Sequence, residues 1–335
     1  MVNDSYHIQF EKLCCTCNLG EITKAPVKVS GGLLHRMFAI ETTKGKYAVK
    51  ALNPQIMERP TALPNYIRAE KVAVIASTRL PALPAMIIEG EFIQKIDHQY
   101  YLIFEWIEGN PLKPDEIDVS HCKKIGAILS DIHNTDFSQI ENHMVLDQMK
   151  EIDWGFYLEE GKKAGSVWVS LLRDTVNQLY IWTEKTKQSP MKLSSDMVIS
   201  HRDLEPKNVM WSQGNPIIID WESAGAIHPK HDVVETALYW SVNETGGINR
   251  EKLNAFVNSY FQKQSGEVET DWGMVLSLGF QGKLEWLEYS LKRSLNIEST
   301  DANDQEQGTA EVTGTIMALK AYEDLIPTLE TWLNR

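Results

Sequence analysis

The chain has 335 residues, of which 43% are hydrophobic and 24% charged, so it carries enough apolar material for a packed core and is not a wholly disordered chain. Its net charge of −13 disfavours binding to nucleic acid, because that affinity comes largely from Lys and Arg neutralising phosphates. A surface of this charge suits a cationic small-molecule partner, or it serves solubility alone.

The N-terminal stretch MVNDSYHIQFEKL has neither the basic start nor the apolar run of a signal peptide. No stretch of the chain approaches the roughly 18 consecutive apolar residues of a membrane span. We therefore expect a cytoplasmic protein that does not bind a membrane. No sequence feature indicates an obligate protein partner.

Three of the four cysteines crowd into four positions near the N-terminus, as Cys14, Cys15 and Cys17. Such crowding is not the spread of a disulfide framework, so we expect reduced thiols. Cys14 and Cys17 have the spacing of half a zinc site. No second pair follows to complete four-coordination.

The first hundred residues predict a small sheet with one helix. Two runs rich in β-forming residues, Leu34–Glu41 and Lys46–Ala51, flank the turn sequence TTKG and predict a hairpin. A helix is predicted over Asn65–Thr78. Two further strands are predicted over Ala85–Ile88 and Tyr100–Trp106.

Beyond Gly109 the pattern changes to long helical stretches, and we place a lobe boundary within Ile107–Leu112. The segment ESTDANDQEQGT, Glu298–Thr309, is almost devoid of apolar residues and predicts an exposed connection. The predicted helices are Ser120–His133, Ser166–Lys187, Arg250–Gln264, Gly273–Ile297 and Val312–Leu333.

The stretch VISHRDLEPKNVMW, residues 198–211, places many charges against apolar runs. Two short apolar strands, Val209–Trp211 and Ile217–Ile219, predict a hairpin that brings Asn208 and Asp220 side by side. An amide oxygen and a carboxylate at neighbouring strand ends suit Mg²⁺, which prefers oxygen ligands. Asp203 then projects from the same loop as an acid beside a metal site.

These residues resemble a known family. His201-Arg202-Asp203 and Asn208, followed by Asp220 in IIDWE, are similar to the catalytic loop and metal-binding aspartate of the protein-kinase-like fold. The resemblance is closer to the aminoglycoside phosphotransferase and choline kinase branch, and it extends over about residues 27–235. It implies a bilobal α+β fold, with a small antiparallel-sheet N-lobe (1–107) that binds nucleotide and a large, mostly helical C-lobe (108–335).

The strand Tyr47-Ala48-Val49-Lys50 resembles the lysine-bearing strand of such kinases. Alternation places Ala48 and Lys50 on one face, where a small residue underlies the base and the lysine reaches the phosphates. The resemblance implies that Glu70 holds this lysine. A surface lysine at a strand end is the plainer interpretation of the same residues.

Two further segments of the predicted N-lobe resemble nucleotide-binding parts. Ser30, Gly31 and Gly32 form a small-residue loop whose backbone amides suit phosphates, although it departs from the G-x-G-x-x-G pattern. The run YLIFEWIEG resembles the hinge between lobes. It implies that Phe104 lines the base pocket, and that the Glu105 carbonyl and the Ile107 amide bond the adenine edge.

The motif His201-Arg202-Asp203 also occurs in protein kinases, so a protein kinase is an alternative interpretation. Such a kinase needs an activation segment ending in A-P-E, and here only Trp221–Lys230 separates the predicted metal aspartate from the next helix. The position two after Asp203, usually lysine in Ser/Thr kinases, is Glu205. We therefore favour a cationic small acceptor, with Glu205 and Glu222 as substrate-side acids.

The resemblance assigns roles to these residues. Asp203 accepts the substrate hydroxyl proton, and Asn208 and Asp220 hold Mg²⁺ on the triphosphate. His201 and Arg202 are structural. A loop brace or a helix cap are the two interpretations of Asp232.

The helical region 137–195 contains a mixture of aromatic and acidic residues. This mixture predicts either an amine-binding surface or a core stripe with a solvated opposite face. Its members are Asp153, Trp154, Phe156, Tyr157, Glu159 and Glu160.

We expect an ATP- or GTP-dependent, Mg²⁺-dependent kinase that phosphorylates a hydroxyl of a small amine-bearing molecule. The wording HRDLEPKN and DWESAG resembles antibiotic kinases of the amicoumacin type, so an antibiotic of that class or an aminoglycoside is the expected acceptor, and resistance the expected outcome. A metabolic kinase of choline, homoserine or a sugar is the alternative. An inactive nucleotide-binding module is the rival of another class.

Overall fold

The computed structural model describes residues 6–29, 35–140, 151–193, 197–243, 246–264, 270–297 and 302–334. The internal contacts of the chain divide it into two compact units. Unit 1 comprises Met1–Met144, Ile199–Ala226 and Thr236–Lys263, and unit 2 comprises Val145–Val198, Ile227–Glu235 and Gln264–Arg335. The two lobes expected from the sequence, 1–107 and 108–335, follow a different division and stay a prediction.

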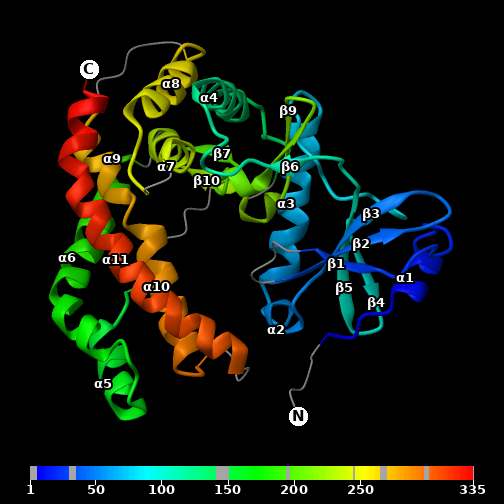
Figure 1. Cartoon of the computed structure of the whole chain (residues 1–335), viewed down its shortest axis with the longest axis horizontal. Coiled ribbons are helices and arrows are strands. Elements are labelled where there is room, and N and C mark those ends of the chain that lie inside the picture. Colours follow the sequence, from blue (N-terminus) through cyan, green and yellow to red (C-terminus); the bar gives the residue numbers. More distant parts are fainter. Residues whose placement is uncertain are drawn as a thin grey trace. The chain divides into compact units, whose positions relative to one another are not determined.

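Unit 1 begins with a five-stranded antiparallel sheet in the order β1-β2-β3-β5-β4 (Figure 1). The predicted hairpin is confirmed, since β2 and β3 pair from Arg36↔Ala51 to Glu41↔Lys46. β3 pairs in turn with β5, which places Ala48 opposite Phe104. The strands are β1 (Val27–Val29), β2 (Arg36–Glu41), β3 (Lys46–Ala51), β4 (Ile93–Ile96) and β5 (Gln99–Glu105).

Two helices follow β3, the short α2 (Pro54–Met57) and the longer α3 (Ala62–Ser77). The predicted helix over Asn65–Thr78 is therefore confirmed, and it begins three residues earlier. The strand predicted over Ala85–Ile88 is wrong, because the backbone amide of Ala85 donates to the Glu70 carboxylate, at 2.6 Å, instead of to a neighbouring strand. The sheet is completed by β4.

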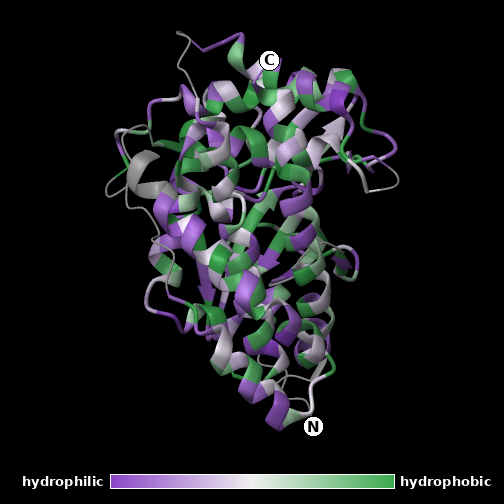
Figure 2. Cartoon of the chain, turned by 90° about the vertical axis from the view of Figure 1, so that its left-hand side faces the viewer, coloured by the Kyte–Doolittle hydropathy of each residue, from purple (hydrophilic) through white to green (hydrophobic). Residues whose placement is uncertain are grey.

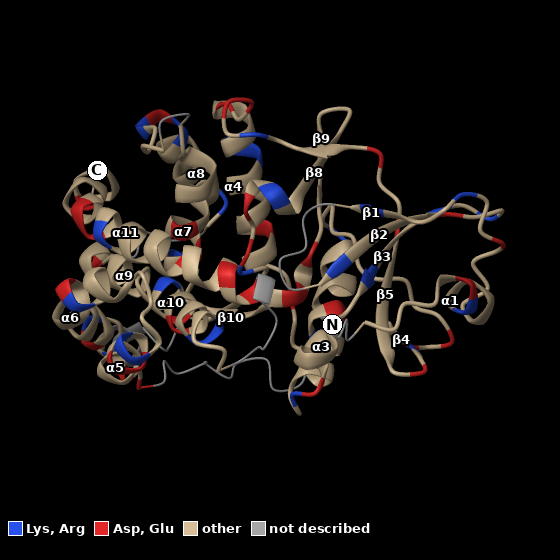
Figure 3. Cartoon of the chain, turned by 60° about the horizontal axis from the view of Figure 1, so that its bottom comes forward, with Lys and Arg blue, Asp and Glu red and all other residues tan. Residues whose placement is uncertain are grey.

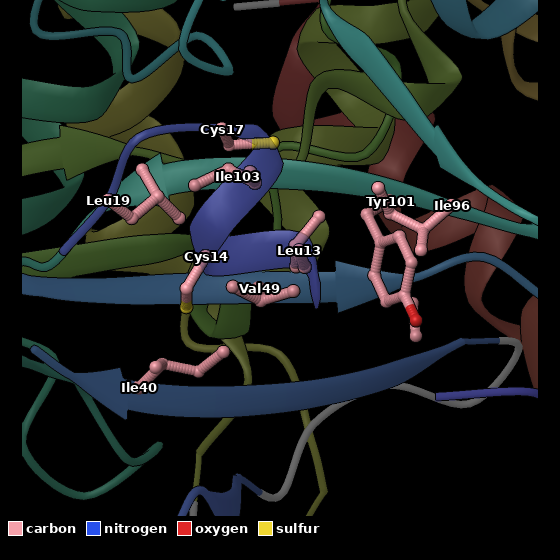
Figure 4. Close-up of a cluster of buried hydrophobic side chains, with 10 residues drawn as sticks. Leu13, Cys14, Cys17, Leu19, Ile40, Val49, Ile96, Tyr101 and Ile103 are labelled. Carbon is pink, nitrogen blue, oxygen red and sulfur yellow. The ribbon is translucent and has the colours of Figure 1, made fainter. Parts of the chain in front are cut away.

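A helix that the sequence analysis missed, α1 (Phe10–Thr16), packs onto the sheet. Figure 4 shows Leu13, Cys14 and Cys17 among buried apolar side chains of the sheet, including Val49. Burial raises the pKa of both thiols, that of Cys17 to about 11, so they pack as small neutral groups. All four cysteines are free, as expected.

The rest of unit 1 supports a second hairpin. β8 (Val209–Ser212) pairs with β9 (Asn215–Ile218), which confirms the predicted strands, and β6 (Asn110–Pro111) lies on the other side of β8. Helices α4 (Val119–His133) and α8 (Arg250–Phe261) pack so closely that a side chain at Gly126 would overlap the backbone of Phe256. The remaining elements here are β7 (Val198–Ser200), β10 (Gly225–Ile227), the 3-10 turns η1 (Pro206–Asn208) and η2 (Trp221–Ser223), and α7 (Pro229–Ser241), which has residues in both units.

Unit 2 is built from long helices whose indole side chains fill its core. Trp154 and Trp182 are fully buried, and the Trp182 ring stacks on Phe280 with centroids 5.4 Å apart. Figure 2 shows hydrophobic and hydrophilic segments alternating along the helices, and no helix in the described ranges is long and apolar enough to cross a membrane. The helices are α5 (Trp154–Ala164), α6 (Val169–Leu193), α9 (Trp272–Leu278), α10 (Gln281–Ser294) and α11 (Ala302–Leu333).

The exposed connection predicted over Glu298–Thr309 is wrong for its described part, which forms the first turns of α11. The polar residues there serve a buried cation, because Arg293 of α10 is only 4% exposed and donates to Asp304 at 2.6 Å and to Gln307 at 3.0 Å. Thr309 is also hydrogen-bonded to Ser294 of α10. The low hydrophobicity of this segment therefore reflects polar partners of a buried arginine.

The single helix predicted over Gly273–Ile297 is broken into α9 and α10. The hydroxyl of Tyr322 in α11 donates to the carbonyl of Leu276 at 2.7 Å and takes the place of a helical partner. A side chain at Gly279 would overlap the Tyr322 ring. Contact with α11 therefore ends α9 at Leu278.

Candidate active site

The β8–β9 hairpin brings Asn208 and Asp220 to the same end of two paired strands. Val209 pairs with Ile218, and the amide of Ile219 donates to the carbonyl of Asn208 at 3.0 Å. The two residues that flank the strands are thereby held next to each other, as the sequence analysis predicted. Both belong to unit 1.

A buried histidine fixes the loop that carries Asp203. His201 is fully buried; its Nδ1 accepts from the amide of Asp203 at 3.2 Å, so its Nε2 donates to the carbonyl of Ile219 at 3.0 Å. Its ring also contacts that of Trp221, with centroids 4.7 Å apart. His201 therefore ties the loop to the end of β9, which agrees with the structural role expected for it.

Asn208, one of the two predicted metal ligands, is hydrogen-bonded to the loop that carries Asp203. Its Nδ2 donates both to the Asp203 carbonyl at 2.8 Å and to the Asp203 carboxylate oxygen Oδ2 at 2.9 Å. These bonds use the amide nitrogen and leave its Oδ1 oxygen for a cation. The Leu204 carbonyl accepts from the indole of Trp240 at 2.8 Å, which holds the loop from its other side.

Two residues of the site have left-handed backbone. Arg202 has φ 64° and Asp220 has φ 62°. Non-glycine residues rarely adopt this conformation, and it persists where the surrounding structure holds it. Arg202 immediately precedes Asp203, and Asp220 lies two residues after the end of β9 at Ile218.

Lys50 points from β3 into the same group of residues. Its ammonium, on a side chain only 7% exposed, donates to Asp220 at 2.6 Å and to Glu222 at 2.8 Å. Burial alone would lower the pKa of this lysine, but the two carboxylates outweigh burial and raise it. The ammonium therefore stays charged, and it lies beside the predicted metal ligand.

The ion pair expected between Lys50 and Glu70 is not formed in this structure. η2 places Asp220 and Glu222 directly on the ammonium, whereas the Glu70 carboxylate accepts from the Ala85 amide. Glu70 is nevertheless close enough for the charge of Lys50 to act on it. Burial raises the pKa of Glu70 to about 7, against the opposing effects of the Ala85 amide and Lys50.

The predicted general base has an environment that raises its affinity for a proton. Burial raises the pKa of Asp203 to about 7; the ammonium of Lys207 opposes this shift and the carboxyl of Glu205 adds to it. Lys207 lies 3.7 Å from Asp203 and 3.1 Å from Glu205. A carboxyl of this pKa can both take up and release a proton near neutral pH. Lys207 is a member of this group that was not predicted from the sequence.

The hinge residues lie at the end of β5. The Trp106 amide donates to the Lys46 carbonyl at 3.2 Å, so Tyr47 and Glu105 form a non-hydrogen-bonded pair and the backbone polar groups of Glu105 point away from β3. Phe104 is buried and faces Ala48 across the two strands. The backbone polar groups of Glu105 are therefore not used by β3, and Phe104 and Ala48 lie as a pair beside them. Of the predicted nucleotide-binding residues, Ser30, Gly31 and Gly32 lie outside the described residues.

Neither predicted substrate-side acid is unpaired. Glu222 binds Lys50, and its Oε2 lies 3.6 Å from Nε2 of His35, while Glu205 pairs with Lys207. Glu222 is thus a member of the lysine cluster. The sequence carried a weak signal of this, because Glu222 follows two residues after Asp220 with the large apolar Trp221 between them.

The aromatic and acidic mixture in 153–160 is a core stripe with a solvated face. Trp154 is buried and donates to Thr183, and Tyr157 is buried and donates to Glu288. Figure 3 shows acidic and basic segments mixed along α5 and α6. In keeping with this, Glu159 and Glu160 pair with lysines three residues on. Asp153 caps α5, and Phe156 is 47% exposed.

Residues 27–264 match the family described as the phosphotransferase enzyme family. The chain belongs to that family. This membership confirms the prediction that the protein is a phosphotransferase. The matched range contains Lys50, Asp203, Asn208 and Asp220.

Solved structures confirm the kinase-like fold of this phosphotransferase. A spectinomycin phosphotransferase in complex with ADP and spectinomycin has a TM-score of 0.66 at 12% identity, over 95% of this chain and 99% of that one. The ethanolamine kinase of Plasmodium vivax has a TM-score of 0.60 at 16% identity, over 90% and 83%. An amicoumacin kinase in complex with AMP-PNP, Ca²⁺ and its antibiotic has a TM-score of 0.60 at 12% identity, over 95% of both chains. No curated protein sequence matches the chain.

Proposed function

We propose that this phosphotransferase moves the γ-phosphoryl group of ATP or GTP to a hydroxyl of a small, amine-bearing molecule, with Mg²⁺ bound to the triphosphate. One observation carries the proposal. Lys50, Asp203, Asn208 and Asp220, which come from three separate parts of the chain, are joined through direct hydrogen bonds and paired strand ends. An inactive binding module has no need for a carboxylate base held by the metal-side amide.

The residues present fit Mg²⁺. Asn208 has its Oδ1 left over, and Asp220 is a carboxylate whose pKa is lowered because the ammonium of Lys50 outweighs burial. No group of three or more His, Cys, Asp or Glu that could hold a metal occurs among the described residues. Two protein oxygens are what Mg²⁺ takes when phosphates and water supply its other ligands. The bound ion would neutralise charge on the phosphates.

The chain's own residues carry the remaining chemistry. Asp203 takes the proton of the acceptor hydroxyl as its oxygen forms a bond to the γ-phosphorus. The bond from that phosphorus to the bridging oxygen breaks, and the nucleoside diphosphate leaves with the electron pair. Lys50 steadies the α and β phosphates, and the proposed hinge groups of Glu105 and Ile107 orient the base, with Phe104 and Ala48 beside it.

The acceptor class is proposed from charge and from the structural neighbours. The chain carries a net charge of −13, which attracts a cationic acceptor. The spectinomycin and amicoumacin kinases act on antibiotics, and we propose an antibiotic of this kind as acceptor, with resistance as the consequence. Glu205 remains the proposed substrate-side acid, because its partner Lys207 is more than half exposed and free to move away.

A metabolic acceptor is the second candidate. The ethanolamine kinase has the same fold, and the name of its substrate describes a small amine-bearing alcohol. The two candidates differ in the size of acceptor and share the proposed chemistry. A screen that contains both classes separates them.

The test is incubation of the protein with ATP or GTP, Mg²⁺ and a panel of hydroxylated antibiotics, choline, ethanolamine, homoserine and sugars. We expect one class to gain about 80 Da, the mass of one phosphoryl group. Asp203→Asn should lower kcat by about 10²- to 10⁴-fold and leave nucleotide affinity close to wild type. The matched control is the exposed Asp115→Asn. Unchanged turnover in Asp203→Asn would remove this residue as the base.

A further inference from the structure

A partly buried hydrogen bond between two uncharged side chains lies beside the group formed by Lys50, Asp220 and Glu222. His35 precedes β2 and is 4% exposed, and Tyr66 is one helical turn before Glu70 on α3. Nε2 of His35 is 2.6 Å from the phenolic oxygen of Tyr66, and the two rings meet edge to face with centroids 5.6 Å apart. The chemistry proposed above does not use either residue.

A backbone amide fixes which nitrogen of His35 carries the proton. The Asn53 amide donates to Nδ1 of His35 at 3.0 Å, and an amide N–H can only donate. Nδ1 therefore has its lone pair toward Asn53, and the ring proton is on Nε2. Burial, helped by the charge of Lys50, lowers the pKa of His35 to about 3, which agrees with a neutral ring.

The position of the ring proton fixes the direction of the hydrogen bond between His35 and Tyr66. Nε2–H of His35 donates to the phenolic oxygen of Tyr66, since the other nearby acceptor, Oε2 of Glu222, is 3.6 Å away. The phenol is then an acceptor toward His35, and its own proton must point elsewhere. In the described part of the chain no hydrogen bond uses that proton. Burial raises the pKa of Tyr66, so the proton is retained.

The position of this unused donor indicates its partner. Oε2 of Glu222, which lies 3.6 Å from Nε2 of His35, also accepts from Lys50 at 2.8 Å. The phenol therefore lies near the ammonium that is proposed to hold nucleotide phosphates. We propose that Tyr66 is a nucleotide-binding residue whose hydroxyl donates to a phosphate oxygen beside Lys50, and that His35 is the positioning residue that turns the hydroxyl in this direction. The inference rests on the proposed function.

A neutral donor has a physical purpose here. Asp220 and Glu222 share one ammonium, so the cluster carries an excess of negative charge toward an incoming polyphosphate. A phenol donates to the anion and adds no charge that the carboxylates could neutralise. Hydrogen bonds to charged groups are worth enough that loss of one weakens binding by about tenfold or more.

The first test is Tyr66→Phe, which removes the hydroxyl and keeps the ring. Calorimetric titration with Mg·ATP, Mg·ADP and adenosine should show about tenfold weaker binding of the two phosphorylated ligands and unchanged binding of adenosine. Tyr100→Phe, on β5 of the same unit, is the matched control and should bind all three as wild type does. A purely structural role for Tyr66 would weaken adenosine as well.

The second test addresses His35. His35→Gln places an amide donor near the position of Nε2, whereas His35→Asn is too short to reach the phenol. We expect the Gln variant to keep most of the affinity for Mg·ATP and the Asn variant to lose about as much as Tyr66→Phe. Because His35 is proposed to act through Tyr66, the double variant His35→Asn/Tyr66→Phe should bind no more weakly than Tyr66→Phe alone.

The outcomes separate this inference from the proposed function. Wild-type protein that binds no nucleotide and phosphorylates no acceptor would overturn the function itself. Wild-type protein that binds Mg·ATP, together with a Tyr66→Phe variant that binds it equally well, would overturn the role of Tyr66 alone. Additive losses in the double variant would refute the link through His35.

Discussion

Glu70 is a carboxyl group that the fold buries on α3 with one backbone hydrogen bond. The Ala85 amide satisfies one of its oxygens, and the charge of Lys50 favours ionisation, but burial prevails and the pKa rises from 4.5 to about 7. In the folded protein the group therefore holds its proton over a range in which the unfolded chain has lost it. Stability depends on pH through this difference.

Because the pKa of Glu70 is raised in the folded protein, the variant Glu70→Gln should change how stability depends on pH. Below pH 4.5 both states are protonated and Glu70 costs nothing; between pH 4.5 and about 7 the unfolded chain ionises first, so wild-type stability falls on the order of 3 kcal/mol and then levels off. The Gln variant cannot ionise, so its stability advantage over wild type should grow across that window. Urea unfolding at several pH values measures it.

The exposed Glu91→Gln is the control and should follow wild type at every pH. A constant difference between Glu70→Gln and wild type from pH 4 to pH 8 would show that Glu70 does not titrate in this way.

Partner choice at the level of single residues was only partly predictable. Asp203, Asn208 and Asp220 could be grouped from the sequence because one short hairpin joins them. The partners of Lys50 could not, because the fold brings three acids within reach of its charge, Glu70, Asp220 and Glu222, and none is a sequence neighbour of Lys50. His35 and Tyr66 gave no sequence signal, since a lone histidine and tyrosine are common in cores.

At the scale of elements, α10 and α11 are joined through a buried cation. Arg293 is held by Asp304 and Gln307, and a side chain at Gly308 would overlap both Arg293 and the α10 backbone. Loss of one partner leaves a buried charge uncompensated, which is more damaging than loss of a surface ion pair.

We therefore expect Asp304→Ala to lower the free energy of unfolding by about 3 kcal/mol. Asp324→Ala, an exposed position on the same helix, is the control and should change it by less than about 0.5 kcal/mol. Chemical denaturation of both variants measures the difference. Equal stabilities would mean that Arg293 finds other partners when Asp304 is removed.

The elements predicted well were those with strong local patterns. The β2–β3 and β8–β9 hairpins and the helices α3, α4 and α8 follow from alternation, turn residues and helical spacing. The errors arose where distant residues intervene. Ala85 gives its amide to Glu70, Tyr322 ends α9, and Arg293 recruits a polar segment into a helix. No local pattern contains these partners.

At the scale of the whole molecule, every proposed nucleotide-binding residue that the structure describes belongs to unit 1. A nucleotide that binds the folded chain and not the unfolded chain should stabilise the folded state by mass action. At 100 times its dissociation constant, Mg·ATP adds about 2.7 kcal/mol and should raise the thermal midpoint by several degrees. Asp220→Asn should lose the part of this shift that needs Mg²⁺, whereas Asp115→Asn should keep it. A shift of equal size in the Asp220→Asn variant would place the metal elsewhere.

The sequence by itself determined the family, the fold class and the group of Asp203, Asn208 and Asp220, because these depend on residues close together in the chain and on patterns with fixed periods. The tertiary structure decided the partners of Lys50, the direction of the Tyr66 hydroxyl and the paths of α9 and α11. Each of these depends on distances between groups far apart in sequence. Burial and hydrogen bonding set their energies, and neither quantity exists until the chain has folded.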